Sequence, residues 1–167
     1  MLILSISENI LYFVCGFGVL QGILLAALVY FHPKSDRSVT IFLALYIFST
    51  SAIMSLPFVL KIVGWQNSFL SQPFPLLGGP LLYLYIRSFK ERISWRKALP
   101  HFIPFFLFFF LAYWNIDRWR GKYPDAIDLP AEMLTDPVTL IMAYLRPLHQ
   151  LIYFVFTRRN LLSYQRS

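Results

Sequence analysis

The chain has 167 residues, of which 57% are hydrophobic and only 14% are charged, against about 25% charged residues in a typical soluble domain. Because a domain of this size leaves much of its surface in water, the composition excludes a soluble globular protein, and it excludes disorder, which needs low hydrophobicity. In so apolar a chain the net charge of +7 indicates attraction to anionic lipid head groups rather than to nucleic acid, and we expect an all-α integral membrane protein.

The first apolar block covers residues 9–31 and predicts a membrane-spanning helix that stays in the protein, since no basic segment precedes it as in a signal peptide. Gly18 and Gly22 have the four-residue spacing that lets two helices approach closely in lipid. We expect packing within the chain, with self-association of two copies as the alternative. Gln21, a polar group at membrane depth, is expected to bond to a neighbouring helix.

The second and third blocks both contain prolines. Residues 39–63 predict a second span, in which Pro57 kinks the helix rather than ending it because apolar residues continue beyond it. Residues 73–89 begin with a segment rich in Pro and Gly, where Gly79 and Pro80 are candidate helix-packing residues. This third block is either a full span or a re-entrant segment that returns to the side it came from.

The last two blocks are separated by the longest polar stretch of the chain. Residues 99–114 predict an aromatic-rich fourth span, whereas 115–137 carry eight charges without helical periodicity and are expected to form a loop. Residues 138–157 predict the fifth span. The transmembrane domain is therefore expected to cover 1–157, followed by a short basic tail over 158–167.

The distribution of Lys and Arg predicts which way the spans run. Ten of the fifteen fall on alternate segments, and four fall on the opposite side together with most of the acids. By the positive-inside rule, the N-terminus is outside and the C-terminus lies in the cytoplasm of what we expect to be a bacterial inner membrane. A re-entrant third block would move five of the ten to the other side, so we predict that it spans. The ten are Lys34, Arg37, Arg87, Lys90, Arg92, Arg96, Lys97, Arg158, Arg159 and Arg166.

Arg146 and His149 are the most informative polar residues, because they lie inside the fifth predicted span and share a helix face. At 1.5 Å per residue Arg146 is about 12 Å deep, where ionisable groups usually face a bundle interior or a wet cavity. The leading interpretation is a structural pair bonded to backbone carbonyls that Pro147 frees. A ligand or anion site and a proton relay are the alternatives. The predicted spans contain no Asp or Glu that could serve as a counter-ion, so the sequence supports a pump or a transporter less well.

Three residues near the third block's basic end, Arg87, Trp95 and His101, are candidates for the membrane interface, where charged and amphipathic side chains concentrate. The His, Cys and acidic residues do not have the spacing of metal ligands. The sequence also lacks a phosphate-binding loop or a recognisable pairing of nucleophile and base. We therefore expect a protein that is not an enzyme, with no catalytic residues, no metal site and no cofactor.

Two strings of residues resemble a known family. Gly79–Ser88 (GPLLYLYIRS) and Leu99–Phe105 (LPHFIPF) are similar to a signature in the N-terminal membrane region of AraC-type transcriptional regulators of Bacteroidetes-like bacteria. In that family a multi-helix membrane domain precedes a cytoplasmic helix-turn-helix DNA-binding domain. The resemblance implies that this chain is the sensory or anchoring part, and that DNA is contacted only through a C-terminal domain absent from it.

We expect an envelope signal, whose ligand the sequence does not identify, to alter helix packing around Arg146 and His149 or in the loop of residues 115–137. That change would move the cytoplasmic DNA-binding domain. The expected partners are the lipid bilayer and, through helix packing, a second copy of the chain. The alternatives are a small transporter or channel-like protein and a passive membrane anchor or partner-binding subunit.

Overall fold

The computed structural model describes residues 2–33, 36–57, 62, 64, 72–124 and 130–165, with side chains from 10 to 162. Over these residues every regular element is a helix, which confirms the predicted all-α class. Four segments are long and apolar enough to cross a membrane, and their bounds are Ile10–Tyr30, Arg37–Met54, Trp95–Lys122 and Pro137–Leu162.

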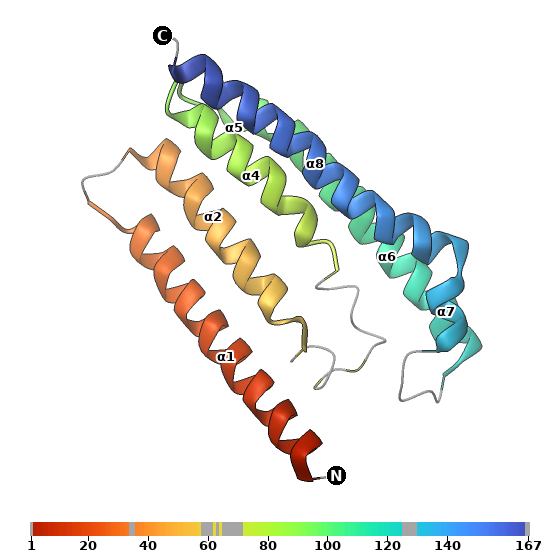
Figure 1. Cartoon of the computed structure of the whole chain (residues 1–167). Helices are drawn as coiled ribbons and strands as arrows, with labels where there is room; N and C mark the ends of the chain where they lie inside the picture. The colour runs from red at the N-terminus through yellow and green to blue at the C-terminus, as the bar shows by residue number, and fades with distance from the viewer. Residues whose placement is uncertain are drawn as a thin grey trace.

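Long helices run alternately up and down the molecule (Figure 1). Helix α1 packs along α2, α2 along α4 and α4 along α8, while α6 contacts both α4 and α8. Short elements lead into α6 and α8. The bounds are α1 Leu2–Tyr30, α2 Arg37–Met54, α4 Pro75–Ser88, α5 Trp95–Ala98, η2 Leu99–Phe102, α6 Ile103–Lys122, α7 Ala131–Thr135 and α8 Pro137–Gln165.

The third predicted span is a helix, but a short one. Helix α4 has 14 residues, about 21 Å at 1.5 Å per residue, whereas the hydrocarbon core of a bilayer is about 30 Å thick. It is therefore not among the four segments that are long enough to cross. It lies between α2 and α8 (Figure 1), and Gly79 and Pro80 are both buried in this packing.

The second predicted span also differs from the structure at its end. Helix α2 ends at Met54, and the Ser55 N–H bonds back to the carbonyls of Ser51 and Ala52. The helix is interrupted by a turn at Ser55, and Leu56 and Pro57 are helical again. Most of the predicted continuation beyond Pro57 lies outside the described residues.

The last two long helices extend further than the apolar pattern predicts. Helix α6 continues to Lys122 through part of the predicted 115–137 loop, because Ile116 and Trp119 are buried against Met133 of α7. Helix α8 continues to Gln165, so the expected tail of 158–167 is helical over its described part. Hydropathy locates the stretch that fits a membrane and not the point where a helix ends.

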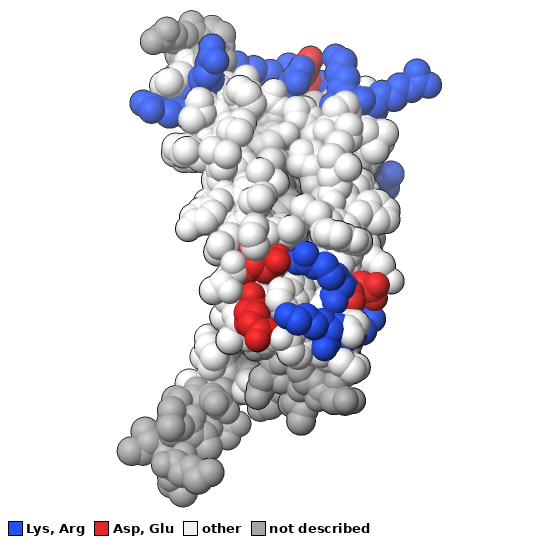
Figure 2. Space-filling view, turned by 90° about the vertical axis from the view of Figure 1, so that its right-hand side faces the viewer, with Lys and Arg blue, Asp and Glu red and all other residues white. Residues whose placement is uncertain are grey.

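The two ends of the bundle carry different charges. Figure 2 shows Lys and Arg gathered along one end, a broad and mostly uncharged band below them, and acids and bases side by side toward the other end. We call the first the basic end; its described residues come from the start of α2, the end of α4, the segment that leads into α6 and the end of α8 (Figure 1), and they are Arg37, Arg87, Lys90, Arg92, Arg96, Lys97, Arg158 and Arg159. We call the second the mixed-charge end, formed by Asp117, Arg118, Arg120, Lys122, Glu132 and Asp136.

The band between the two ends has the surface of a protein that lies in lipid. Large apolar side chains on α1, α6 and α8 are exposed, among them Phe13, Leu28, Phe110 and Phe154. A soluble monomer rarely exposes a contiguous apolar surface of this extent. The apolar helices are thus suited to a bilayer, and the buried core lies between α2, α4, α6 and α8.

Candidate functional site

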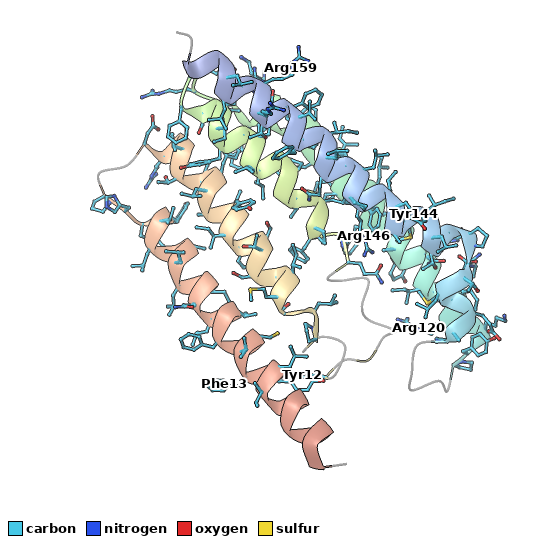
Figure 3. The ribbon with its side chains drawn as sticks, viewed as in Figure 1. Tyr12, Phe13, Arg120, Tyr144, Arg146 and Arg159 are labelled. Atoms are coloured by element: carbon cyan, nitrogen blue, oxygen red, sulfur yellow. The ribbon has the colours of Figure 1, made fainter. Side chains whose placement is uncertain are left out.

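The candidate site is the mid-depth contact between α8 and the start of α4. Arg146 lies nine residues after the first residue of α8, about 14 Å along the helix axis. Figure 3 shows its side chain reaching from α8 toward the chain that leads into α4. Because α4 begins only at Pro75, Arg146 meets the residues just before α4, and Gln150, one turn later, meets its first turn.

Two glycines allow α8 to lie close to α4. A Cβ atom on Gly79 would be 2.7 Å from the Cβ of Tyr153, and one on Gly78 would be 3.4 Å from Nε2 of Gln150. Gln150 Nε2 donates a hydrogen bond to the carbonyl of Pro75, which belongs to the first turn of α4. This bond ties α8 to the start of α4.

Arg146 is held by one hydrogen bond and one aromatic ring. Its Nη2 donates to Oε1 of Gln72 at 2.7 Å, and its guanidinium lies 5.0 Å from the centre of the Phe108 ring. Its Nε is buried and has no hydrogen-bond partner among the described residues. The ion pairs found in that part of the chain do not include Arg146. Arg146 therefore contacts a neutral amide and an aromatic ring, whereas a buried cation usually pairs with a carboxylate.

His149 shares the face of Arg146, as the three-residue spacing predicts, but the two are not joined. Both ring nitrogens of His149 are buried without a hydrogen-bond partner in the described structure, and its ring centre lies 4.8 Å from that of Tyr153. Neither residue bonds to a backbone carbonyl there, in contrast to the leading interpretation of a pair satisfied by carbonyls around Pro147. Helix α8 runs through Pro147 as one element.

His101 contacts α8 as well as standing near the basic end. Its Nδ1 lies 2.8 Å from the hydroxyl of Tyr153, and its ring centre is 5.2 Å from that of Tyr83 on α4. Trp95 is exposed on α5, and Arg87 pairs with Glu91 at 2.5 Å. Both of these residues lie at the basic end, and their assignment to the membrane interface stays a prediction.

The glycines of α1 face α2. A Cβ atom on Gly22 would overlap the side chain of Ser51, and one on Gly18 would be 2.8 Å from Met54. These contacts are the intramolecular packing that the spacing predicts. Gln21 instead is exposed and has no hydrogen-bond partner among the described residues, in contrast to its expected bond to a neighbouring helix. It precedes Gly22 by 100° of helix rotation, which turns it away from α2.

The polar cluster at the mixed-charge end is a second group of interacting residues. Arg118 Nη2 lies 2.8 Å from Asp136 Oδ2 and 2.9 Å from Oδ1 of Asn115. Asp136 also accepts hydrogen bonds from the backbone N–H groups of Val138 and Thr139, so it caps α8, whose first residue is Pro137. The cluster locks the ends of α6 and α8 together.

Sequence reasoning missed several residues of these sites. Gln150 and Tyr153 lie four and seven residues after Arg146, so the helical repeat could have placed them on one face with it. Gln72 and Phe108 come from distant parts of the chain, and local spacing carries no signal for them.

In chemical terms the mid-depth site offers buried nitrogen atoms that could bind an anionic group. The described His, Cys and acidic residues form no group that could hold a metal ion.

Comparison with models of protein families, with characterised proteins and with solved structures finds no match to this chain.

Proposed function

We propose that the chain is the membrane-embedded sensory and anchoring domain of an AraC-type transcriptional regulator in a bacterial inner membrane. The mixed-charge end is outside and the basic end is in the cytoplasm, as the positive-inside rule requires. Five crossings then connect the two sides, the third being made by α4 with residues 72–74 before it. The resemblance of the strings Gly79–Ser88 and Leu99–Phe105 to such regulators supports the assignment.

The observation that carries this proposal is the reach of α8. This one helix of 29 residues, about 43 Å long, begins at the Arg118–Asp136 contact and meets Gln72 at mid-depth through Arg146. It then passes Arg158 and Arg159 at the basic end. A displacement at the mixed-charge end can therefore reach the cytoplasmic side through a single rigid element, to which an output domain would be attached.

The mid-depth contact supplies a place where α8 can change its packing. A buried polar group without a partner costs about 1–3 kcal/mol, and Arg146 Nε and both nitrogens of His149 are such groups. A shift of α8, or a ligand that pairs with these atoms, recovers part of that cost. We therefore expect two arrangements of similar free energy, as an element that responds to a signal requires.

The contacts of Arg146 support the transporter alternative less well than the regulatory role. Coupled transport usually relies on acids and bases that pair within the membrane, whereas Arg146 contacts the neutral side chain of Gln72. Residues 58–71, which precede Gln72 in the sequence, contain no Asp or Glu that could serve as its counter-ion.

Cysteine labelling tests the orientation. In a Cys15→Ser background, single cysteines are placed at Ser94, which precedes α5 at the basic end, and at Leu134 in α7 at the mixed-charge end. A maleimide that does not cross the membrane should label the Leu134→Cys variant in intact cells, and the Ser94→Cys variant only after lysis. The reverse pattern would overturn the orientation.

The regulatory role is tested on the gene that encodes the chain. Codons in frame after Ser167 should encode a helix-turn-helix domain, and an unrelated continuation would overturn the AraC-type assignment. In the regulator, the double change Arg146→Leu and His149→Leu should abolish the response of a target promoter to its inducing condition. The matched control is Tyr144→Leu, which alters an exposed side chain of α8 and should respond normally. Unchanged induction in a double variant that reaches the membrane would remove the site from the mechanism.

A further inference from the structure

An open groove of about 590 Å³ lies between α2, α4 and α8. Tyr46 and Thr50 on α2 form one wall, and Phe154 and Thr157 on α8 form the other. Gly78 and Gly79 line it from α4. Gln150 and Tyr153, which pack against these two glycines, also line the groove. The groove borders the candidate site: Arg146 is not among its lining residues, but Pro75, Gln150 and Tyr153 are.

The length of the groove matches one leaflet of a bilayer. Its α8 wall extends from Pro147 to Thr157, ten residues or about 15 Å along the helix. Half of a hydrocarbon core of about 30 Å is also about 15 Å. A transmembrane helix of a second copy would need a surface about twice as long. The dimensions therefore favour an acyl chain over a second protein helix.

The end of the groove that faces the basic end is polar and positively charged. Thr157 is only 6% exposed, and its hydroxyl has no hydrogen-bond partner in the described part of the chain. Arg158 follows Phe154 by four residues, so it continues the groove-lining face of α8 by one turn. Arg159 is rotated by a further 100° and lies outside that face. The mouth thus combines an apolar channel with an exposed guanidinium, and the Thr157 hydroxyl is buried beside it.

We propose that this groove binds an anionic phospholipid from the leaflet at the basic end. One acyl chain lies along the groove between the α2 wall and the α8 wall. The phosphate meets the exposed guanidinium of Arg158. The lipid bridges three helices that otherwise leave a gap. The site needs only that the helices lie in a bilayer, and it does not depend on the proposed regulatory role.

Native mass spectrometry of the whole chain tests the site. The protein is taken from bilayers that contain equal amounts of phosphatidylglycerol and phosphatidylcholine with identical acyl chains, and the lipid retained in mild detergent is counted. We expect one retained phosphatidylglycerol per protein. Arg158→Gln should weaken its retention about fivefold, the scale of one Arg at an anionic membrane surface. Arg159→Gln removes the same charge from the neighbouring face and should retain the lipid as the wild type does.

A second change fills the groove itself. Thr50→Phe places a ring where the acyl chain would lie, and the folded variant should retain neither lipid. Three results would overturn the site: equal losses in the two Arg variants, equal retention of both lipids by the wild type, or a protein dimer in place of the lipid adduct. Both Arg side chains are exposed, so their comparison remains decisive even if Thr50→Phe fails to fold.

Discussion

The two ends of the bundle use the same residue types in opposite ways. At the mixed-charge end Trp119 is 7% exposed, and the guanidinium of Arg118 and the ammonium of Lys122 lie over its ring at 5.6 and 4.9 Å. At the basic end Trp95 is 52% exposed. Arg92, three residues before Trp95, is also exposed, and its Nε lies 4.0 Å from Oδ2 of Asp36.

This difference shows what each end is built to meet. At the mixed-charge end the bases pair with acids and cover an aromatic core. This cluster satisfies its own charges and is stabilised by contacts within the chain. A surface of exposed cations is attracted to an anionic leaflet and contributes little to stability within the chain. The mixed-charge end should therefore be sensitive to substitution in the isolated protein, and the basic end should be sensitive mainly through the membrane.

The largest effect that separates the two ends is expected from their tryptophans. Trp119→Ala removes a ring that packs with Ile116 and Met133 and stacks on Tyr123. Truncating a buried Trp to Ala typically costs about 3–5 kcal/mol. We expect a loss of that size in the free energy of unfolding, measured in mixed micelles by titration with a denaturing detergent.

Trp95→Ala is the matched control at the basic end. Its ring is 5.9 Å from that of Phe42 and is otherwise half exposed, so we expect a loss below about 1 kcal/mol. Equal losses in the two variants would show that the ends do not differ in packing as described.

The next effect in size separates two carboxylates. Asp136→Ala removes both the cap of α8 and the partner of Arg118. A lost cap costs about 1 kcal/mol, and a partly exposed ion pair adds up to about 1 kcal/mol. We therefore expect a loss of about 2 kcal/mol in the same unfolding measurement. Glu91→Ala breaks the exposed pair with Arg87 at the basic end and should cost much less stability than Asp136→Ala, because solvent screens an exposed ion pair. A larger loss in Glu91→Ala than in Asp136→Ala would contradict this order.

The sequence predicts more of this fold than of its contacts. Apolar stretches of about 20 residues predict helices in lipid because the backbone must satisfy its hydrogen bonds within each segment. The Lys and Arg residues that fall on alternate segments predict two unlike ends, because positive side chains collect on the cytoplasmic side of a membrane. Helix ends are less predictable: α8 continues past Arg158 and Arg159, since charged residues are as compatible with a helix as apolar ones once they lie outside the lipid.

The contacts of the candidate site depend on how distant segments pack. Arg146 and His149 stand out because ionisable groups are rare at that depth, yet the partner of Arg146 is 74 residues away at Gln72. His101 and Tyr153 are 52 residues apart. No local repeat encodes such pairings. They follow from the short α4 and its glycines, which determine the height at which α8 meets it.

The smallest effect is the dependence of the mixed-charge end on pH. Partial burial would raise the pKa of the Asp136 carboxyl, but the backbone N–H of Thr139 and the guanidinium of Arg118 outweigh it, so the pKa lies below its ordinary value of 3.8. The folded state therefore binds the proton less tightly than the unfolded state does. Its stabilising effect is complete above pH 3.8 and is lost as the pH falls through the lower folded pKa.

Thermal unfolding in detergent between about pH 6 and about pH 2.5 should reveal this loss. The wild type should be more stable than Asp136→Asn at the upper end of the range, and the two curves should converge in acid, because the protonated carboxyl resembles the amide. Glu91→Gln is the control from the basic end: the hydrogen bond from Arg87 also lowers the pKa of Glu91, but the pair is exposed and screened by solvent, so this variant should keep more of the acid dependence of the wild type than Asp136→Asn does. If Asp136→Asn kept the full acid dependence of the wild type, the carboxylate that links α6 to α8 would not be the group that titrates, and the cap at the mixed-charge end would have to be stabilised by its aromatic core alone.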